Sequence, residues 1–260
     1  MKKSLCYGGF PSRMSHRDRL ALIREAGFDG VEPGQTGSRD ELMQVAELAR
    51  EVGLELPSLM CTTHWQFPLS ATDESVRDKA VAGVAEGLRQ AQAIGAPVLL
   101  VVPGLVTEDV SYAAAWEISQ RSLRELIPVA EETGVTLALE NVWNRFLLSP
   151  REMAEFVDSF AHPLVGAYLD VGNMLLYGFP HHWIEMLGSR IKKVHVKDFD
   201  MSSRTFVGLL QGSVDFPRVM SALRGIGYDD HLIVEVGPYR QYPEQFVRDA
   251  AAQMDCILHS

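Results

Sequence analysis

The sequence contains few cysteines and no long apolar run. Its 260 residues include three cysteines, Cys6, Cys61 and Cys256, with no CxxC pair among them. A sparse, odd set of this kind is a poor disulfide framework and favours a reducing, cytoplasmic setting. No segment reaches the roughly 18 consecutive apolar residues of a membrane span, so we expect no membrane partner. The opening residues, MKKSLCYGGF, have no apolar stretch behind their lysines, so we expect no signal peptide.

Positive charge is also scarce. The chain has 24 Lys+Arg against 34 Asp+Glu, a formal net charge of −10. Nucleic-acid binding needs clustered Lys and Arg, so this balance argues against a nucleic-acid partner. Glycine-rich nucleotide loops are missing too: the first apolar run leads into GGFPSRMSH, not GxGxxG, and GxxxxGK[ST] does not occur.

The chain does have a regular alternation of short apolar runs and longer amphipathic segments. Several of the runs are near-continuous Val, Leu and Ile, which is typical of parallel strands buried on both faces. The eight predicted strands are Ser4–Tyr7, Phe28–Glu32, Leu54–Met60, Val98–Val102, Val135–Glu140, Leu164–Asp170, Ile191–His195 and Leu232–Glu235.

Helices are predicted between these strands, several of them ending at a glycine, the expected helix stop. They are Ser15–Ala26, Arg39–Val52, Asp73–Ile94, Ser111–Thr133, Pro150–Phe160, His181–Leu187, Phe216–Ile226 and Pro243–Leu258. Eight such units in 260 residues predict an α/β protein that folds as a single (β/α)8 TIM barrel domain over residues 1–260. A doubly wound open sheet is the alternative, but the glycine-rich loop that usually accompanies it is missing.

Polar residues stand at the carboxyl ends of four consecutive predicted strands, where such barrels carry their active groups. Glu140 follows VTLAL, Asp170 follows LVGAYL, His195 lies in KVHVKD, and Glu235 follows HLIV. A lone Glu or His at a strand end is more often structural, but three carboxylates and an imidazole together repel unless a cation neutralises them. An oxygen-rich set with one nitrogen suits Mn²⁺, Mg²⁺ or Co²⁺ more than structural Zn²⁺.

Other polar residues near these strand ends allow more than one interpretation. Glu32, at the end of the second strand, is either a substrate contact or part of a rim ion pair. His64 and Trp65, in CTTHWQF, either wall a sugar or cover the top of the barrel. Lys197 could contribute to an anion site together with Arg145, Arg204 and Arg240. Lys193, two residues before His195, is either part of such a site or a barrel salt bridge.

Seven segments in combination resemble the xylose-isomerase-like barrel family of sugar isomerases and epimerases. The resemblance is strongest to its L-ribulose/xylulose-5-phosphate 3-epimerase and tagatose 3-epimerase branch. The segments are GFDGVE, MCTTHWQFPLS, LALENVWNRFLLSP, YLDVGNMLLYG, IKKVHVKDFD, LLQGSVDF and LIVEVG.

The resemblance implies a metal-dependent enzyme of carbohydrate metabolism. Glu140, Asp170, His195 and Glu235 would bind one divalent ion, with Mn²⁺ favoured and Mg²⁺, Co²⁺ or Zn²⁺ left open. Glu140 and Glu235 would also exchange a proton on opposite faces of a ketose or ketose phosphate, through a metal-stabilised enediolate, giving 3-epimerisation or isomerisation. A dimer or tetramer is also implied. The expected substrate contacts are Glu32, His64, Trp65, Asn173 and Lys197.

The chain departs from both branches of the family. HWQFP stands where phosphopentulose epimerases have arginines in a pattern like HRRFP, which weakens the case for a substrate phosphate. DVGN lacks the histidine that follows the metal aspartate in tagatose-type enzymes. A lyase or dehydratase acting on a keto-sugar, keto-inositol or 3-keto-glycoside through the same site remains an alternative. A DNA-repair endonuclease and a non-catalytic barrel are disfavoured by the acidic composition and the complete ligand set.

Overall fold

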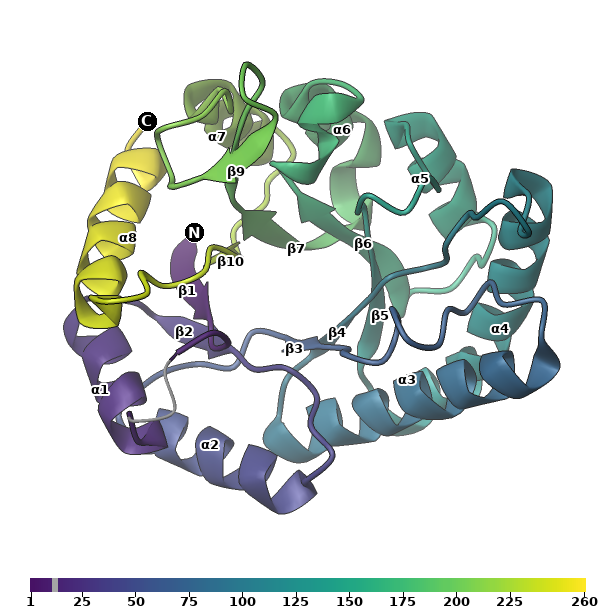
Figure 1. The fold of residues 1–260 in the computed structure, drawn as a ribbon, viewed down its shortest axis with the longest axis horizontal. Helices are drawn as coiled ribbons and strands as arrows, with labels where there is room; N and C mark the ends of the chain where they lie inside the picture. Colours follow the sequence, from purple (N-terminus) through teal and green to yellow (C-terminus); the bar gives the residue numbers. More distant parts are fainter. Residues whose placement is uncertain (11–13) are drawn as a thin grey trace.

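The computed structural model describes residues 1–10 and 14–260, in which strands and helices alternate along the chain. Figure 1 shows the strands of the barrel surrounded by a ring of helices. The strands of the barrel are β1 (Lys2–Cys6), β2 (Gly30–Glu32), β3 (Leu59–Met60), β4 (Val98–Val101), β5 (Thr136–Glu140), β6 (Val165–Asp170), β7 (Ile191–Val196) and β10 (His231–Val234).

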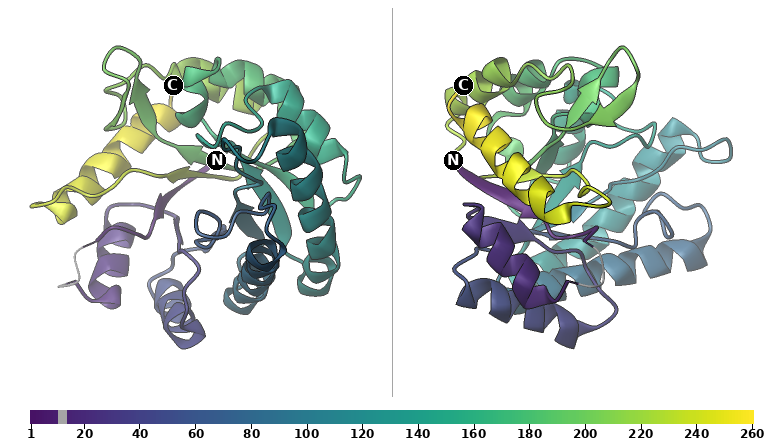
Figure 2. Two further views of the ribbon diagram at one scale, coloured as in Figure 1. Left: turned by 45° about the vertical axis from the view of Figure 1, so that its right-hand side comes forward. Right: turned by 60° about the vertical axis from the view of Figure 1, so that its left-hand side comes forward.

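The strands form one parallel sheet that curls round on itself (Figure 2). Their order is β2-β1-β10-β7-β6-β5-β4-β3, so that β2 and β3 meet at the seam. Isolated parallel bridges join Gly30 to Glu55 and Gly34 to Met60 across this seam. The predicted TIM barrel is therefore confirmed.

The helices begin and end close to the predicted positions. Ser149 caps the first turn of the helix Pro150–Asp158 in a reciprocal capping box with Glu152. Gly95 and Gly134 end the helices Glu74–Ile94 and Tyr112–Thr133 in the left-handed conformation, at φ 72° and 68°. None of the described helices is both long and apolar enough to cross a bilayer. The helices are α1 (His16–Glu25), α2 (Arg39–Glu51), α3 (Glu74–Ile94), α4 (Tyr112–Thr133), α5 (Pro150–Asp158), α6 (Pro180–Leu187), α7 (Phe216–Gly225) and α8 (Pro243–Leu258).

The third strand is much shorter than predicted. Only Leu59–Met60 are in the ladder, whereas the sequence predicts a strand over 54–60. Pro57 has no N–H to donate to a neighbouring strand, so the segment before Leu59 keeps only the bridge at Glu55. Apolar character alone therefore overestimated the strand.

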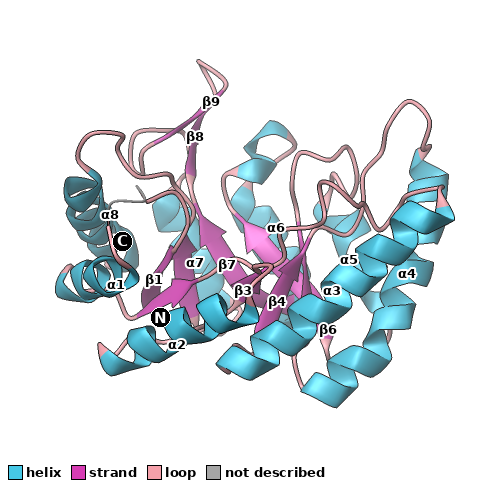
Figure 3. Cartoon of the chain, turned by 60° about the horizontal axis from the view of Figure 1, so that its bottom comes forward, coloured by secondary structure: helices cyan, strands magenta, loops and turns pink. Residues whose placement is uncertain are grey.

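An antiparallel hairpin that the sequence analysis did not predict follows β7. It consists of β8 (Asp198–Asp200) and β9 (Thr205–Val207), and it rises above the carboxyl ends of the barrel strands (Figure 3). The buried Asp198 carboxylate accepts hydrogen bonds from the backbone N–H groups of Gly212 and Val214, at 2.8 and 3.1 Å. These bonds tie the base of the hairpin to the loop that leads into α7.

Replacing Gly30 by alanine is expected to destabilise the barrel at its seam. An added Cβ would lie 2.7 Å from Ser4 Oγ and 2.8 Å from the backbone oxygen of Glu55, so the seam has to shift. Overpacking of this kind costs about 1–3 kcal/mol. Thermal unfolding measures the effect. Gly37→Ala is the matched control, because a Cβ there meets nothing within 4 Å. Equal melting temperatures for the two variants would contradict the prediction.

Candidate active site

Neighbouring strands bring the four strand-end residues together. Asp170 of β6 is paired with His195 of β7, Glu140 ends β5, and Glu235 directly follows β10. The N–H of Glu235 donates to the carbonyl of Val196 at 3.0 Å, which continues the ladder one residue beyond β10. One potential ligand atom from each of Glu140, Asp170, His195 and Glu235 lies within 4.8 Å of all the others.

The cluster contains fewer positively charged groups than carboxylates. His195 Nδ1 lies 3.0 Å from Glu140 Oε1 and 3.4 Å from Glu235 Oε2. The Lys197 ammonium lies 2.5 Å from Glu235 Oε2 and 3.1 Å from Asp170 Oδ2. Asp170 Oδ2 is buried and accepts no well-directed hydrogen bond. A buried, hydrogen-bond-free carboxylate oxygen among two more carboxylates and an imidazole fits a divalent cation with a preference for oxygen ligands.

The surroundings shift the pKa values of the two glutamates in opposite directions. Burial, together with the negative charge of Glu235, raises the pKa of Glu140 to about 7. Burial acts in the same direction on Glu235, but His195 and Lys197 outweigh it and hold the pKa of Glu235 well below its usual range. Near neutral pH, one carboxyl can thus carry a proton while the other is ionised, a difference that acid–base sites use.

Glu32 lies on the far side of the His195 ring from this cluster. Its Oε2 lies 2.7 Å from His195 Nε2, and its Oε1 accepts hydrogen bonds from Ser58 Oγ and Tyr168 OH, both at 2.6 Å. Glu32 is only 1% exposed. Its carboxylate is therefore engaged within the protein, and it fixes the His195 ring with Nδ1 toward the other carboxylates. A carboxylate in this position typically orients a metal-binding histidine.

The other predicted substrate contacts all line one cavity of about 220 Å³, which we call the inner chamber. His64, Trp65, Asn173 and Lys197 line it together with Glu140 and Glu235. His64 Nδ1 is buried without a hydrogen-bond partner, and burial lowers the pKa of His64 to about 4, so its imidazole is neutral near pH 7.

Several residues at this site were not predicted. Tyr168 stands two positions before Asp170 on the same strand, so the two-residue period of a strand could have placed both on the inner face. Trp143 and Phe206 also line the inner chamber, and their rings stack with centroids 4.8 Å apart. No local pattern signals this pair, because it depends on the hairpin after β7.

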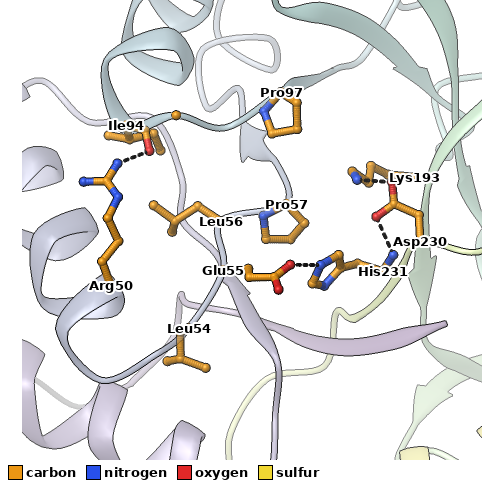
Figure 4. Close-up of a pocket in the computed structure, with 11 residues that line it drawn as sticks. Arg50, Leu54, Glu55, Leu56, Pro57, Ile94, Pro97, Lys193, Asp230 and His231 are labelled. Atoms are coloured by element: carbon orange, nitrogen blue, oxygen red, sulfur yellow. Dashed lines mark hydrogen bonds and ion pairs between the residues drawn. The ribbon is translucent and has the colours of Figure 1, made fainter.

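Of the predicted anion-binding residues, Lys197 lines the inner chamber and the others lie elsewhere. Lys193 is buried at the amino-terminal end of the barrel, where its ammonium pairs with Asp230 at 2.5 Å beside a cavity of about 500 Å³ (Figure 4). In the same cavity, His231 Nε2 lies 2.9 Å from Glu55 Oε2. Lys193 thus forms a salt bridge within the barrel, at the amino-terminal end, where residues usually contribute to stability. Among the described residues, the lining of the inner chamber does not include Arg145, Arg204 or Arg240.

Comparison with known proteins agrees with this architecture. The family model of the xylose isomerase-like TIM barrel matches residues 20–255. An L-ribulose-5-phosphate 3-epimerase (UlaE) of Escherichia coli is 27% identical over 234 residues, which is 84% of this chain and 81% of that protein. A solved L-ribulose 3-epimerase has a TM-score of 0.84 at 20% identity, over 99% of this chain and 94% of that one. D-psicose 3-epimerase with D-tagatose, from Clostridium cellulolyticum H10, has a TM-score of 0.80 at 20% identity, over 100% and 99%.

Replacing Glu32 by glutamine is expected to weaken divalent-metal binding. The amide holds the His195 ring less firmly than the carboxylate, and losing such an orienting partner typically lowers metal affinity about 10–100-fold. Titration with Mn²⁺ measures this. Glu55→Gln is the matched control, since it changes the same kind of Glu–His contact at the other end of the barrel. Equal Mn²⁺ affinities in the two variants would show that Glu32 does not position His195.

Proposed function

The chain is an enzyme that belongs to the xylose isomerase-like TIM barrel family, and we propose that it epimerises a ketose at carbon 3 with one divalent metal ion. The observation that carries this proposal is the cluster of Glu140, Asp170, His195 and Glu235, whose ligand atoms lie within 4.8 Å of one another. We propose that these four side chains hold the ion, with Mn²⁺ as the preferred metal. When bound, such an ion supplies Lewis acidity that makes the C–H next to a sugar carbonyl easier to deprotonate.

Glu140 and Glu235 are the proposed acid–base pair. Glu140 enters the inner chamber from β5, and Glu235 enters from the end of β10, so the two carboxyl groups approach a bound sugar from different strands. One removes the proton from the carbon next to the carbonyl, and the other returns a proton to the opposite face. The configuration at that carbon inverts while the composition of the sugar is unchanged.

The remaining inner-chamber residues are proposed to hold the sugar. The neutral imidazole of His64 can both donate and accept hydrogen bonds with hydroxyl groups. Asn173 is fixed in place, because its side-chain amide donates to the Asn141 carbonyl at 2.9 Å and its backbone N–H donates to Asp170. The Lys197 ammonium faces the chamber beside Glu235, and Trp65 supplies an apolar wall.

We also propose that the partner of the protein is a small-molecule sugar and that the protein lies in a reducing, cytoplasmic location. The location is supported by the three cysteines, which are all free thiols.

Replacing Asp170 and His195 together by alanine is expected to remove the bound metal. Elemental analysis of the purified protein should find about one divalent ion per chain in the wild type and none in this variant. Circular dichroism checks that the variant keeps its fold. A wild-type protein that takes up no metal, even after incubation with Mn²⁺, would overturn the proposed metal site.

Replacing Glu140 by glutamine is expected to lower turnover by about 10²–10⁴-fold, the usual contribution of a positioned acid or base. Deuterium wash-in from D₂O next to the ketose carbonyl measures the proton step directly. Glu117→Gln, on the exposed surface of α4, is the control. Near-normal wash-in in the Glu140 variant would exclude it as an acid–base group. A product that has lost water would point instead to a lyase or dehydratase.

A further inference from the structure

The ammonium group of Lys197 contacts two of the four residues that are proposed to hold the metal ion. It lies 2.5 Å from Glu235 Oε2 and 3.1 Å from Asp170 Oδ2. Glu235 Oε2 also lies 3.4 Å from His195 Nδ1, so the lysine and the imidazole meet at the same carboxylate oxygen. Lys197 therefore places its positive charge within the ligand cluster and not only at the wall of the inner chamber.

The loop after β6 leaves room for the Lys197 side chain at Gly172. The backbone of Gly172 has φ −84° and ψ −41°, a conformation that any residue adopts. A Cβ at this position would nevertheless lie 2.7 Å from Cγ of Lys197 and 3.0 Å from its backbone oxygen. Glycine is therefore needed here because Lys197 passes so close, and not because of the backbone conformation. The segment that carries Asp170 thus packs directly against the lysine.

The ring of Phe206 holds the ammonium from another direction. Nζ of Lys197 lies 5.1 Å from the centroid of this ring, within the range of cation–π attraction. Phe206 is itself stacked on Trp143, with the two ring centroids 4.8 Å apart. The side chain of Lys197 is only 13% exposed. Its ammonium is therefore kept beside the carboxylates by the surrounding protein.

The contact with Asp170 supplies charge without satisfying the carboxylate oxygen. Asp170 Oδ2 is buried and accepts no well-directed hydrogen bond, although the ammonium is 3.1 Å away. Asp170 Oδ1, in contrast, accepts hydrogen bonds from the backbone N–H groups of Gly172 and Asn173, at 2.9 and 2.6 Å. One oxygen thus orients the carboxylate, and the other keeps its lone pairs for a cation. Lys197 lowers the cost of burying this negative charge while leaving Oδ2 able to bind.

We infer that Lys197 is an internal counter-ion that competes with the divalent metal ion and thereby sets the metal affinity of the site. Its ammonium offsets part of the charge of Asp170 and Glu235 when these carboxylates hold no metal. When they hold one, the ammonium remains in the cluster and is repelled by the ion, so the four ligands bind more weakly than they would alone. This inference rests on the proposed metal site and gives Lys197 a role besides the proposed sugar contact.

Replacing Lys197 by methionine tests the inference, because methionine keeps an unbranched side chain but carries no charge. A neighbouring charge commonly changes the affinity of a group for its proton by about 10–1,000-fold, and a divalent ion carries twice the charge of a proton. We therefore expect Lys197→Met to bind Mn²⁺ at least about tenfold more tightly than the wild type. Calorimetric titration of protein that has been treated with EDTA measures this.

Thermal unfolding of the same proteins gives a second readout. Without metal, Lys197→Met should melt at a lower temperature than the wild type, because the buried carboxylates lose a counter-charge. Saturating Mn²⁺ should then raise the melting temperature of the variant by more than that of the wild type, as tighter binding requires. Lys197→Gln is neutral but can still donate a hydrogen bond to a carboxylate, and it replaces Lys197→Met if that variant misfolds.

Two controls separate the effect of charge from that of packing. Lys197→Arg keeps the positive charge and should not bind Mn²⁺ more tightly than the wild type. Lys193→Met, two residues earlier on β7, removes a buried ammonium that pairs with Asp230 at the opposite end of the barrel. It should lower the melting temperature equally with and without Mn²⁺ and leave the Mn²⁺ affinity unchanged.

The possible results distinguish this inference from the proposed function. An Mn²⁺ affinity that Lys197→Met leaves unchanged or weakens, or an equal gain in affinity in Lys197→Arg, overturns the counter-ion role and leaves the proposed metal site intact. A wild-type protein that binds no Mn²⁺ overturns the proposed metal site, and the counter-ion role with it.

Discussion

The excess of buried negative charge around His195 is the constraint that shapes this end of the barrel. Four carboxylates, from Glu32, Glu140, Asp170 and Glu235, surround the imidazole, and Lys197 supplies an ammonium group. Even with His195 protonated and Glu140 carrying a proton, three carboxylates face two positive charges, so the cluster lacks a positive counter-charge. Burying ionised carboxylates costs several kcal/mol each unless they are paired, so the cluster needs such a counter-charge.

The parallel register gives this cluster its geometry. Because Asp170 and His195 are paired between β6 and β7, neighbouring strands deliver their functional groups at the same height. Two residues earlier on β7, Lys193 faces the opposite end of the barrel and pairs with Asp230. One strand therefore contributes a stabilising ion pair at one end and a chemical group at the other, as TIM barrels commonly do.

The sequence was informative where the pattern is local. Apolar runs followed by a carboxylate predicted both the strands and the cluster of Glu140, Asp170 and Glu235. Prediction failed at 54–58, where Pro57 interrupts a segment that is otherwise apolar enough for a strand. It also left the position of Glu32 undecided, because the contact with His195 joins residues 163 positions apart. The stacking of Trp143 on Phe206 could not be predicted either. The two residues are far apart in the sequence, and the hairpin that carries Phe206 has strands of only three residues, too short to show a strand pattern.

The residues proposed for the chemistry and a residue that shapes the substrate space lie on different parts of the chain. The acid–base and ligand residues lie on the barrel strands or directly after them, where the sheet holds them in place. Phe206, which lines the inner chamber, lies on a short appendage outside that sheet. Insertions, deletions or substitutions between Asp198 and Val207 can therefore reshape the space beside the reacting sugar without disturbing the barrel ladder. In evolutionary terms, the range of substrates can diverge among descendants of this chain while the chemistry is inherited unchanged.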